Sequence, residues 1–73
     1  MKYVIGKNSI CIFSENISHD RMSRQMDGEI VSAGFCRFNN GGLESWGRSV
    51  SLNSISKPED DAILNGFLNK IED

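Results

Sequence analysis

The chain has 73 residues, 38% of them hydrophobic, and a formal net charge of −2. This length predicts one domain over residues 1–73 with a small core, and it leaves no room for a second domain. The acidic balance lacks the basic excess that is typical of nucleic-acid-binding domains. Residues 1–37 carry five Lys/Arg and four Asp/Glu, whereas residues 38–73 carry three and six.

The first elements in chain order are two strand-like runs, residues 2–5 and 9–14, joined by Gly6, Lys7 and Asn8. Glycine and asparagine adopt the positive φ angles of tight turns, so we expect a short β-hairpin here. Lys7 and Asn8 also interrupt the apolar run at the N-terminus. We therefore expect neither a signal peptide nor a membrane-spanning segment.

A short helix is predicted over residues 19–26. Ser18 is a good N-cap residue, and Asp20 lies in the first turn, where a negative charge suits the helix dipole. Ile17 and Met22 have the spacing of a hydrophobic staple. Gly28 is expected to end the helix.

Residues 29–53 form the longest strand-like stretch and surround an Asn/Gly cluster at residues 39–42, which predicts a second hairpin. In its second strand, Trp46, Val50 and Leu52 occupy even positions and predict a core-facing side. The odd positions are small or polar, so the other side is expected to be flat. Gly34 in the first strand is interpreted as a bulge.

A second helix is predicted after Ser56 and Glu59, which form a capping-box pattern. It carries one apolar stripe, formed by Ile63, Leu64, Phe67, Leu68 and Ile71. Gly66 lies inside this helix and is interpreted as a point of close approach to a strand.

The expected fold is α+β with the element order ββαββα. Its simplest arrangement is a four-stranded, mainly antiparallel sheet with both helices packed on one face. That arrangement leaves the second face of the sheet open.

No catalytic, metal or cofactor site is predicted. His19 is the only histidine and is expected to be an exposed residue at the start of the first helix. Cys11 and Cys36 lie in apolar runs and are read as buried thiols of a reduced, cytoplasmic protein. The acidic residues at 59–61 match what the helix dipole alone predicts. We therefore expect a non-enzymatic protein, and an enzyme with its site at a dimer interface is the least favoured reading.

The open sheet face is the main candidate for function. A small core, exposed strand edges and a flat face favour a homodimer that acts by binding another, unidentified protein. The candidate interaction residues are Arg37, Ser45, Arg48, Ser49 and Ser51. A solvated face without a partner is the alternative, as in many antiparallel sheets.

Nucleic-acid binding is the second functional hypothesis. Arginines on an open sheet, close to Trp46, Phe35 or Phe38, would hold phosphates while bases stack on the aromatic rings. The candidate contacts are Arg21, Arg24, Arg37 and Arg48. Arg37 and Arg48 are expected to be neighbours across the central hairpin.

Overall fold

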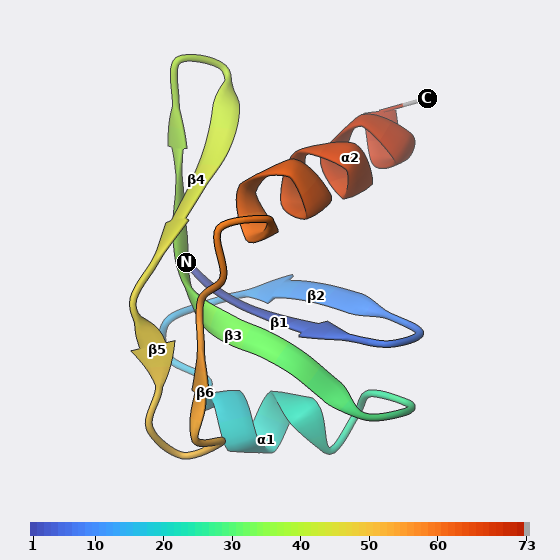
Figure 1. The fold of residues 1–73 in the computed structure, drawn as a ribbon, viewed down its shortest axis with the longest axis vertical. Coiled ribbons are helices and arrows are strands. Elements are labelled where there is room, and N and C mark those ends of the chain that lie inside the picture. The colour runs from blue at the N-terminus through green and yellow to red at the C-terminus, as the bar shows by residue number, and fades with distance from the viewer. Residues whose placement is uncertain (73) are drawn as a thin grey trace.

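The computed structural model describes residues 1–72, and the side chains of residues 1–70. Its main sheet is antiparallel, with the strand order β2-β1-β3-β4, and β5 and β6 form a separate two-stranded sheet. The elements follow each other as β1 (Lys2–Gly6), β2 (Ile10–Phe13), α1 (His19–Ser23), β3 (Ile30–Asn39), β4 (Gly42–Trp46), β5 (Arg48–Ser49), β6 (Ser54–Ile55) and α2 (Asp60–Glu72) (Figure 1). The predicted α+β class and four-stranded sheet are confirmed, whereas the small β5–β6 hairpin was not expected. Among the described residues, none of the helices has the length and apolar character needed to span a membrane.

The central hairpin turns where the sequence predicts. Asn40 and Gly41 both have positive φ angles, 53° and 82°, as a two-residue hairpin turn requires. Phe38 then lies opposite Leu43, and Phe35 lies opposite Trp46. The turn therefore fixes the register of β3 with β4, and this register determines on which face of the sheet each side chain lies.

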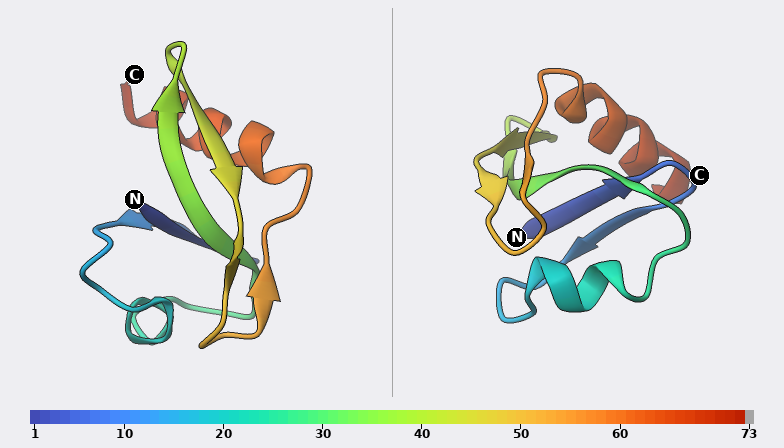
Figure 2. Two further views of the ribbon diagram at one scale, coloured as in Figure 1. Left: turned by 90° about the vertical axis from the view of Figure 1, so that its left-hand side faces the viewer. Right: turned by 60° about the horizontal axis from the view of Figure 1, so that its bottom comes forward.

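The two helices pack on opposite faces of the sheet, so the expectation that both lie on one face is wrong (Figures 1 and 2). The strand β1 explains this arrangement, because it is buried on both sides. Tyr3 and Ile5 join a cluster with Leu64 of α2, whereas Val4 joins a second cluster that includes Met22 of α1. A central strand with apolar residues at successive positions needs cover on both faces. The open face that the sequence predicted is consequently occupied.

Helix α1 is shorter than predicted and ends at Ser23. Its N-cap is confirmed, since the Ser18 hydroxyl accepts a hydrogen bond of 3.0 Å from the backbone nitrogen of Arg21. After the helix, Gln25 and Met26 make tight turns in which their nitrogens bond to carbonyl oxygens three residues back. Gly28 has a φ of 92°, as expected of a chain reversal, but it follows these turns and not the helix itself.

The second strand of the central hairpin breaks at Gly47, whose φ is 79°. Trp46 and Val50 are consequently 45% and 80% exposed, whereas Ser49 is buried. The predicted assignment of Trp46 and Val50 to the core is therefore wrong, while Leu52 does pack partly against the α1-side cluster. The chain beyond the break folds into the β5–β6 hairpin, which lies beside β3 (Figure 2).

Gly34 is not the bulge that the sequence suggested, since the register shift lies between Ile5 and Gly6 of the neighbouring strand. A Cβ atom at Gly34 would lie 2.6 Å from the carbonyl oxygen of Trp46. Glycine is needed here because two backbones approach closely. Gly66 shows the reverse, because a Cβ atom there would meet nothing within 4 Å. The close approach predicted at Gly66 is therefore wrong.

Helix α2 starts at Asp60, slightly later than the predicted capping box. The Asp60 carboxylate accepts a hydrogen bond of 2.9 Å from the backbone nitrogen of Lys57, and the Asp60 nitrogen donates to the Lys57 carbonyl at 3.0 Å. The apolar stripe is confirmed for Ile63, Leu64 and Leu68, which pack in the core with Leu64 fully buried, whereas Phe67 is only partly buried. The side chain of Ile71, the last member of the stripe, lies outside the described residues.

Candidate functional site

The two outer edges of the main sheet differ, and this difference defines the first candidate surface. At the β4 edge, the Asn65 side chain accepts a hydrogen bond of 2.7 Å from the nitrogen of Leu43 and donates one of 2.9 Å to its carbonyl oxygen. Asp61 accepts from both the nitrogen and the hydroxyl of Ser45, at 2.6 and 2.5 Å. Polar side chains of α2 thus close this edge against another strand.

The β2 edge has no such closure among the described residues. Strand β2 pairs only with β1, and its four residues, from Ile10 to Phe13, carry no charge. Edge strands are normally protected by charged residues, proline, bulges or a covering element. The outer edge of β2 therefore offers unpaired backbone groups to another strand.

An apolar groove lies between this edge and α2. Its volume is about 360 Å³. The groove is lined chiefly by Ile10, Ile12, Phe38, Leu43, Phe67 and Leu68. Phe38 is 62% exposed, so the lining includes a large aromatic surface in contact with water. Exposed apolar surface beside an unpaired strand is typical of a protein-protein contact.

A second candidate surface lies on the face of the sheet that carries α1, at its β3–β4 end. The rings of Phe35 and Trp46 stack with centroids 6.1 Å apart and planes inclined by 25°. The Arg37 guanidinium lies 5.5 Å from the Trp46 ring centroid, in cation-π contact. We call Phe35, Arg37, Trp46 and Arg48 the Trp46 platform.

A shallow pocket of about 480 Å³ adjoins this platform. Lys2 and Arg48 bring two positive charges to its lining, together with the hydroxyl groups of Ser18 and Ser51. None of the described residues that line it is acidic. The Lys2 ammonium group is held in place by a hydrogen bond of 3.0 Å to the carbonyl oxygen of Ile17. The pocket thus combines positive charge, hydroxyl groups and aromatic surface.

His19 contributes to this pocket but is itself buried, with 5% of its surface exposed, so the expected exposed position is wrong. Its ring lies edge-on to both Phe13 and Phe35, with centroids 5.7 Å away. The Nε2 atom lies 2.8 Å from the carbonyl oxygen of Gly34. A carbonyl oxygen only accepts, so Nε2 carries the proton and donates it. His19 thus holds the start of α1 against β3.

The predicted interaction residues do not form one face. Arg37, Arg48 and Ser51 are exposed near Trp46, whereas Ser45 bonds to α2 and Ser49 is buried. Arg37 lies opposite Glu44, 3.6 Å from its carboxylate.

The four arginines of the nucleic-acid hypothesis also lie apart. Arg48 lies opposite Ile55 of β6, so Arg37 and Arg48 are not cross-strand neighbours. Arg21 and Arg24 are exposed on and just after α1, and neither lines the pocket beside Trp46. Arg24 instead pairs with Asp20 at 2.9 Å.

A buried polar cluster, missed in the sequence, joins α2 to the sheet. The fully buried Tyr3 hydroxyl donates to Asp60 at 2.5 Å, and the Ser32 hydroxyl donates to the same carboxylate at 2.9 Å. Burial and the hydrogen bond to Asp60 raise the pKa of Tyr3 well above its ordinary value. The acidic run at residues 59–61 was read only as a match to the helix dipole. The sequence signal for this tertiary role is a hydroxyl group within each of two apolar, strand-like runs, Tyr3 in β1 and Ser32 in β3. The register of the two strands places both on one face of the sheet.

The two thiols show no sign of activation. Burial raises the pKa of both Cys11 and Cys36, which favours the neutral thiol over the nucleophilic thiolate. Both are free cysteines, and Cys36 is fully buried. Among the described residues, no group of three or more His, Cys, Asp or Glu side chains is placed to hold a metal ion.

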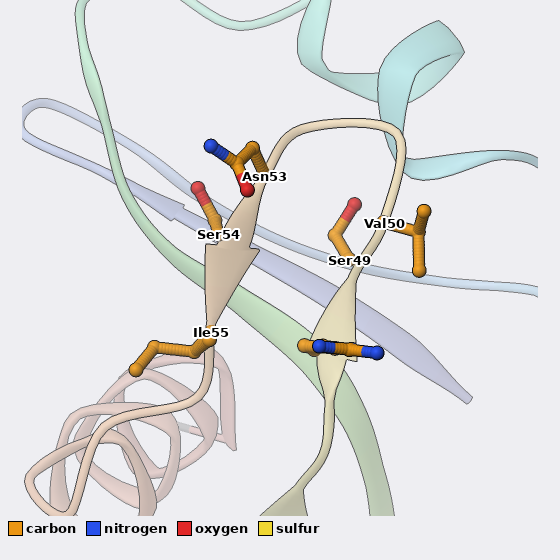
Figure 3. Close-up of a pocket in the computed structure, with 6 residues that line it drawn as sticks. Ser49, Val50, Asn53, Ser54 and Ile55 are labelled. Atoms are coloured by element: carbon orange, nitrogen blue, oxygen red, sulfur yellow. The ribbon is translucent and has the colours of Figure 1, made fainter.

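The β5–β6 hairpin encloses a pocket of only about 180 Å³ (Figure 3). Figure 3 shows Val50 and Ile55 pointing outward on opposite sides of this hairpin. Ligand pockets usually measure at least about 300 Å³, so this hollow is too small for a typical organic ligand. The apolar groove and the Trp46 platform remain the two candidate surfaces.

No protein-family model matches this chain, and neither a curated protein sequence nor a solved structure is significantly similar to it.

Proposed function

We propose that this chain is a small, non-enzymatic cytoplasmic interaction module that pairs with a second copy of itself through β2 and acts by binding another protein. The observation that carries the proposal is the unpaired, uncharged outer edge of β2. Asp61 and Asn65 close the opposite edge of the same sheet, which is formed by β4. A strand from another chain can therefore pair with this sheet at the β2 edge.

The face alternation of β2 defines how two copies would pair. Ile10 and Ile12 point to the α2 side, whereas Cys11 packs against the α1-side cluster. In an antiparallel pair related by a two-fold axis perpendicular to the sheet, opposing residues share a face. Pairing centred on Cys11 places Cys11 opposite Cys11 of the second copy and Ile10 opposite Ile12. The result is one continuous eight-stranded sheet.

The same pairing would bring the two apolar grooves together. Both copies of α2 would lie on one face of the joined sheet, with Phe67 and Leu68 beside the two-fold axis. A standard interface buries about 800 Å² on each partner, which is roughly a sixth of the 4,760 Å² exposed by one copy. A domain of this size has a small core, and association would stabilise it by mass action.

The histidine and the two cysteines, the side chains best suited to catalysis, are engaged in the fold, which supports a binding role. His19 is fixed by Gly34 and two aromatic rings, and the raised pKa values of Cys11 and Cys36 disfavour thiolate formation. Two reduced cysteines in partly or fully buried positions suit the cytoplasm.

Cross-linking combined with sedimentation equilibrium tests the dimer. Under mild oxidation with copper phenanthroline, the pairing centred on Cys11 predicts a disulfide-linked dimer on a non-reducing gel. Cys11→Ser should abolish this band, whereas Cys36→Ser should leave it unchanged, because the Cys36 side chain is fully buried. A monomer at high micromolar concentration in sedimentation equilibrium would refute the proposal.

A pair of isoleucine variants separates edge pairing from general surface effects. Ile12→Lys places a charge on β2, which is how natural edge strands resist pairing, and it should shift the protein to monomer. Ile55→Lys is the matched control, because Ile55 is 60% exposed on β6, away from this edge. Equal effects of the two variants would argue against the β2 interface.

A further inference from the structure

We infer that the Trp46 platform and its adjoining pocket bind single-stranded nucleic acid, a function separate from dimerisation. The platform presents an exposed aromatic surface. Trp46 stacks on Phe35 and yet remains 45% exposed. Buried stacking would serve the core, whereas an exposed stacked pair leaves π surface for a planar ligand.

The platform and its pocket also carry local positive charge. Arg37 lies against the Trp46 ring, and Arg48 and Lys2 line the pocket, so three cations surround one aromatic group. Glu44 partly neutralises Arg37 at 3.6 Å, but the described lining residues add no carboxylate. An anionic ligand with planar groups fits this surface, and a nucleotide chain supplies both features.

The net charge of −2 does not oppose this assignment, because the acidic run at residues 59–61 lies away from the platform, and Glu44 offsets only one of its three neighbouring cations. Asp60 and Asp61 of this run lie in the first turn of α2, and α2 packs on the opposite face of the sheet from the platform. Within that run, Asp60 is buried and Asp61 bonds to Ser45. The overall acidity therefore lowers the affinity at physiological salt but leaves the platform locally positive.

Single strands are favoured over duplexes and over acidic proteins. A duplex keeps its base faces stacked inside, where the Trp46 ring would not reach them. An acidic peptide would pair with the arginines, but its carboxylates would not stack on the exposed Trp46 ring.

The single tryptophan of the chain makes the site directly observable. Fluorescence titration of the wild type with octathymidylate at 50 and 200 mM salt should quench the Trp46 emission, with weaker binding at the higher salt. Duplex DNA, poly-glutamate and thymidine monophosphate should each bind more weakly. No quenching at 50 mM salt, or equal quenching by any of these three ligands, would overturn the proposal.

Variants locate the contact through fluorescence anisotropy of a labelled oligonucleotide. Trp46→Leu should lower the affinity by about 5- to 150-fold, the range for loss of one base-stacking contact. Arg48→Ala should reduce the slope of log affinity against log salt by about 0.7, the value for one phosphate contact to a single strand.

Arg24→Ala is the matched control, because it also removes one exposed positive charge but lies outside the pocket. It should change the affinity less than twofold. Circular dichroism should show that every variant is folded. A loss for Arg24→Ala equal to that for Arg48→Ala would show that net charge governs the binding, and it would overturn the assignment of the site.

Discussion

Replacing Asn65 by alanine should destabilise the domain, even though alanine is the better helix former. The Asn65 side chain makes two hydrogen bonds to the backbone of Leu43, at 2.7 and 2.9 Å. A hydrogen bond contributes about 0.5–1.5 kcal/mol net, so their loss costs about 1–3 kcal/mol. The gain in helix propensity offsets at most about 0.7 kcal/mol of this. We therefore expect a net loss of about 0.3–2.3 kcal/mol.

The next residue supplies the control for this measurement. Gly66→Ala also introduces alanine into α2, but an added Cβ there contacts nothing within 4 Å. It should stabilise the domain by about 1 kcal/mol. Urea unfolding, followed by Trp46 fluorescence and by circular dichroism, gives both free energies. If Asn65→Ala stabilised the domain as Gly66→Ala does, the closure of the β4 edge by Asn65 would be refuted.

Three further predictions test the core and the partly buried thiol of Cys11. Gly34→Ala should destabilise the domain by about 1–3 kcal/mol in urea unfolding, since its Cβ would lie 2.6 Å from a carbonyl oxygen of β4; an unchanged midpoint would contradict the close approach. Tyr3→Phe should cost about 1.5–3 kcal/mol, because it removes a hydrogen bond to the buried Asp60 carboxylate. Folding raises the pKa of Tyr3, so the free energy of unfolding of the wild type should fall as the pH rises above about 10, where tyrosine in the unfolded chain ionises. If Tyr3→Phe lost the same stability at alkaline pH, this explanation would be contradicted. A thiol reagent should modify Cys11 before Cys36, and more slowly at higher protein concentration, whereas a rate that is independent of concentration would argue against pairing through β2.

Local signals in the sequence predicted the central turn, the cap of the first helix and the second helix, because turn and cap residues act over a few positions. The Asn-Gly turn at residues 40–41 and the Ser18 cap both form as expected. The apolar stripe of α2 also meets the core through Leu64. Each of these features depends mainly on residues that lie close to it in the sequence.

The errors arose where tertiary geometry decides the outcome. One glycine, Gly47, resets the alternation after β4, and this turns Trp46 and Val50 outward. The alternation in β1 shows apolar residues on both faces, but only the tertiary structure shows that α1 and α2 divide them. The face of the sheet that each helix covers depends on packing between residues far apart in the sequence, and a local sequence pattern does not predict it.

The candidate site was predicted only in part for the same reason. Arg37 and Arg48 were selected, and both are exposed near Trp46, but they reach that position from β3 and β5 and not as cross-strand partners. The buried role of His19 was missed, because it depends on a carbonyl group of β3.

The two proposals together constrain how a dimer would hold nucleic acid. Pairing through β2 leaves each β3–β4 end at the far side of the joined sheet, so the two Trp46 platforms lie six strand spacings apart. At about 4.8 Å per strand this is about 29 Å. The sheet twist of about 20–25° per strand turns them by about 120–150° relative to each other. A short oligonucleotide would therefore contact one platform, whereas a long flexible strand has to wrap around the sheet to reach both. Ile12→Lys should then weaken the binding of a 40-nucleotide strand, through loss of avidity, and leave octamer binding unchanged. Equal weakening for both lengths would mean that the nucleic-acid site and the dimer interface are not independent.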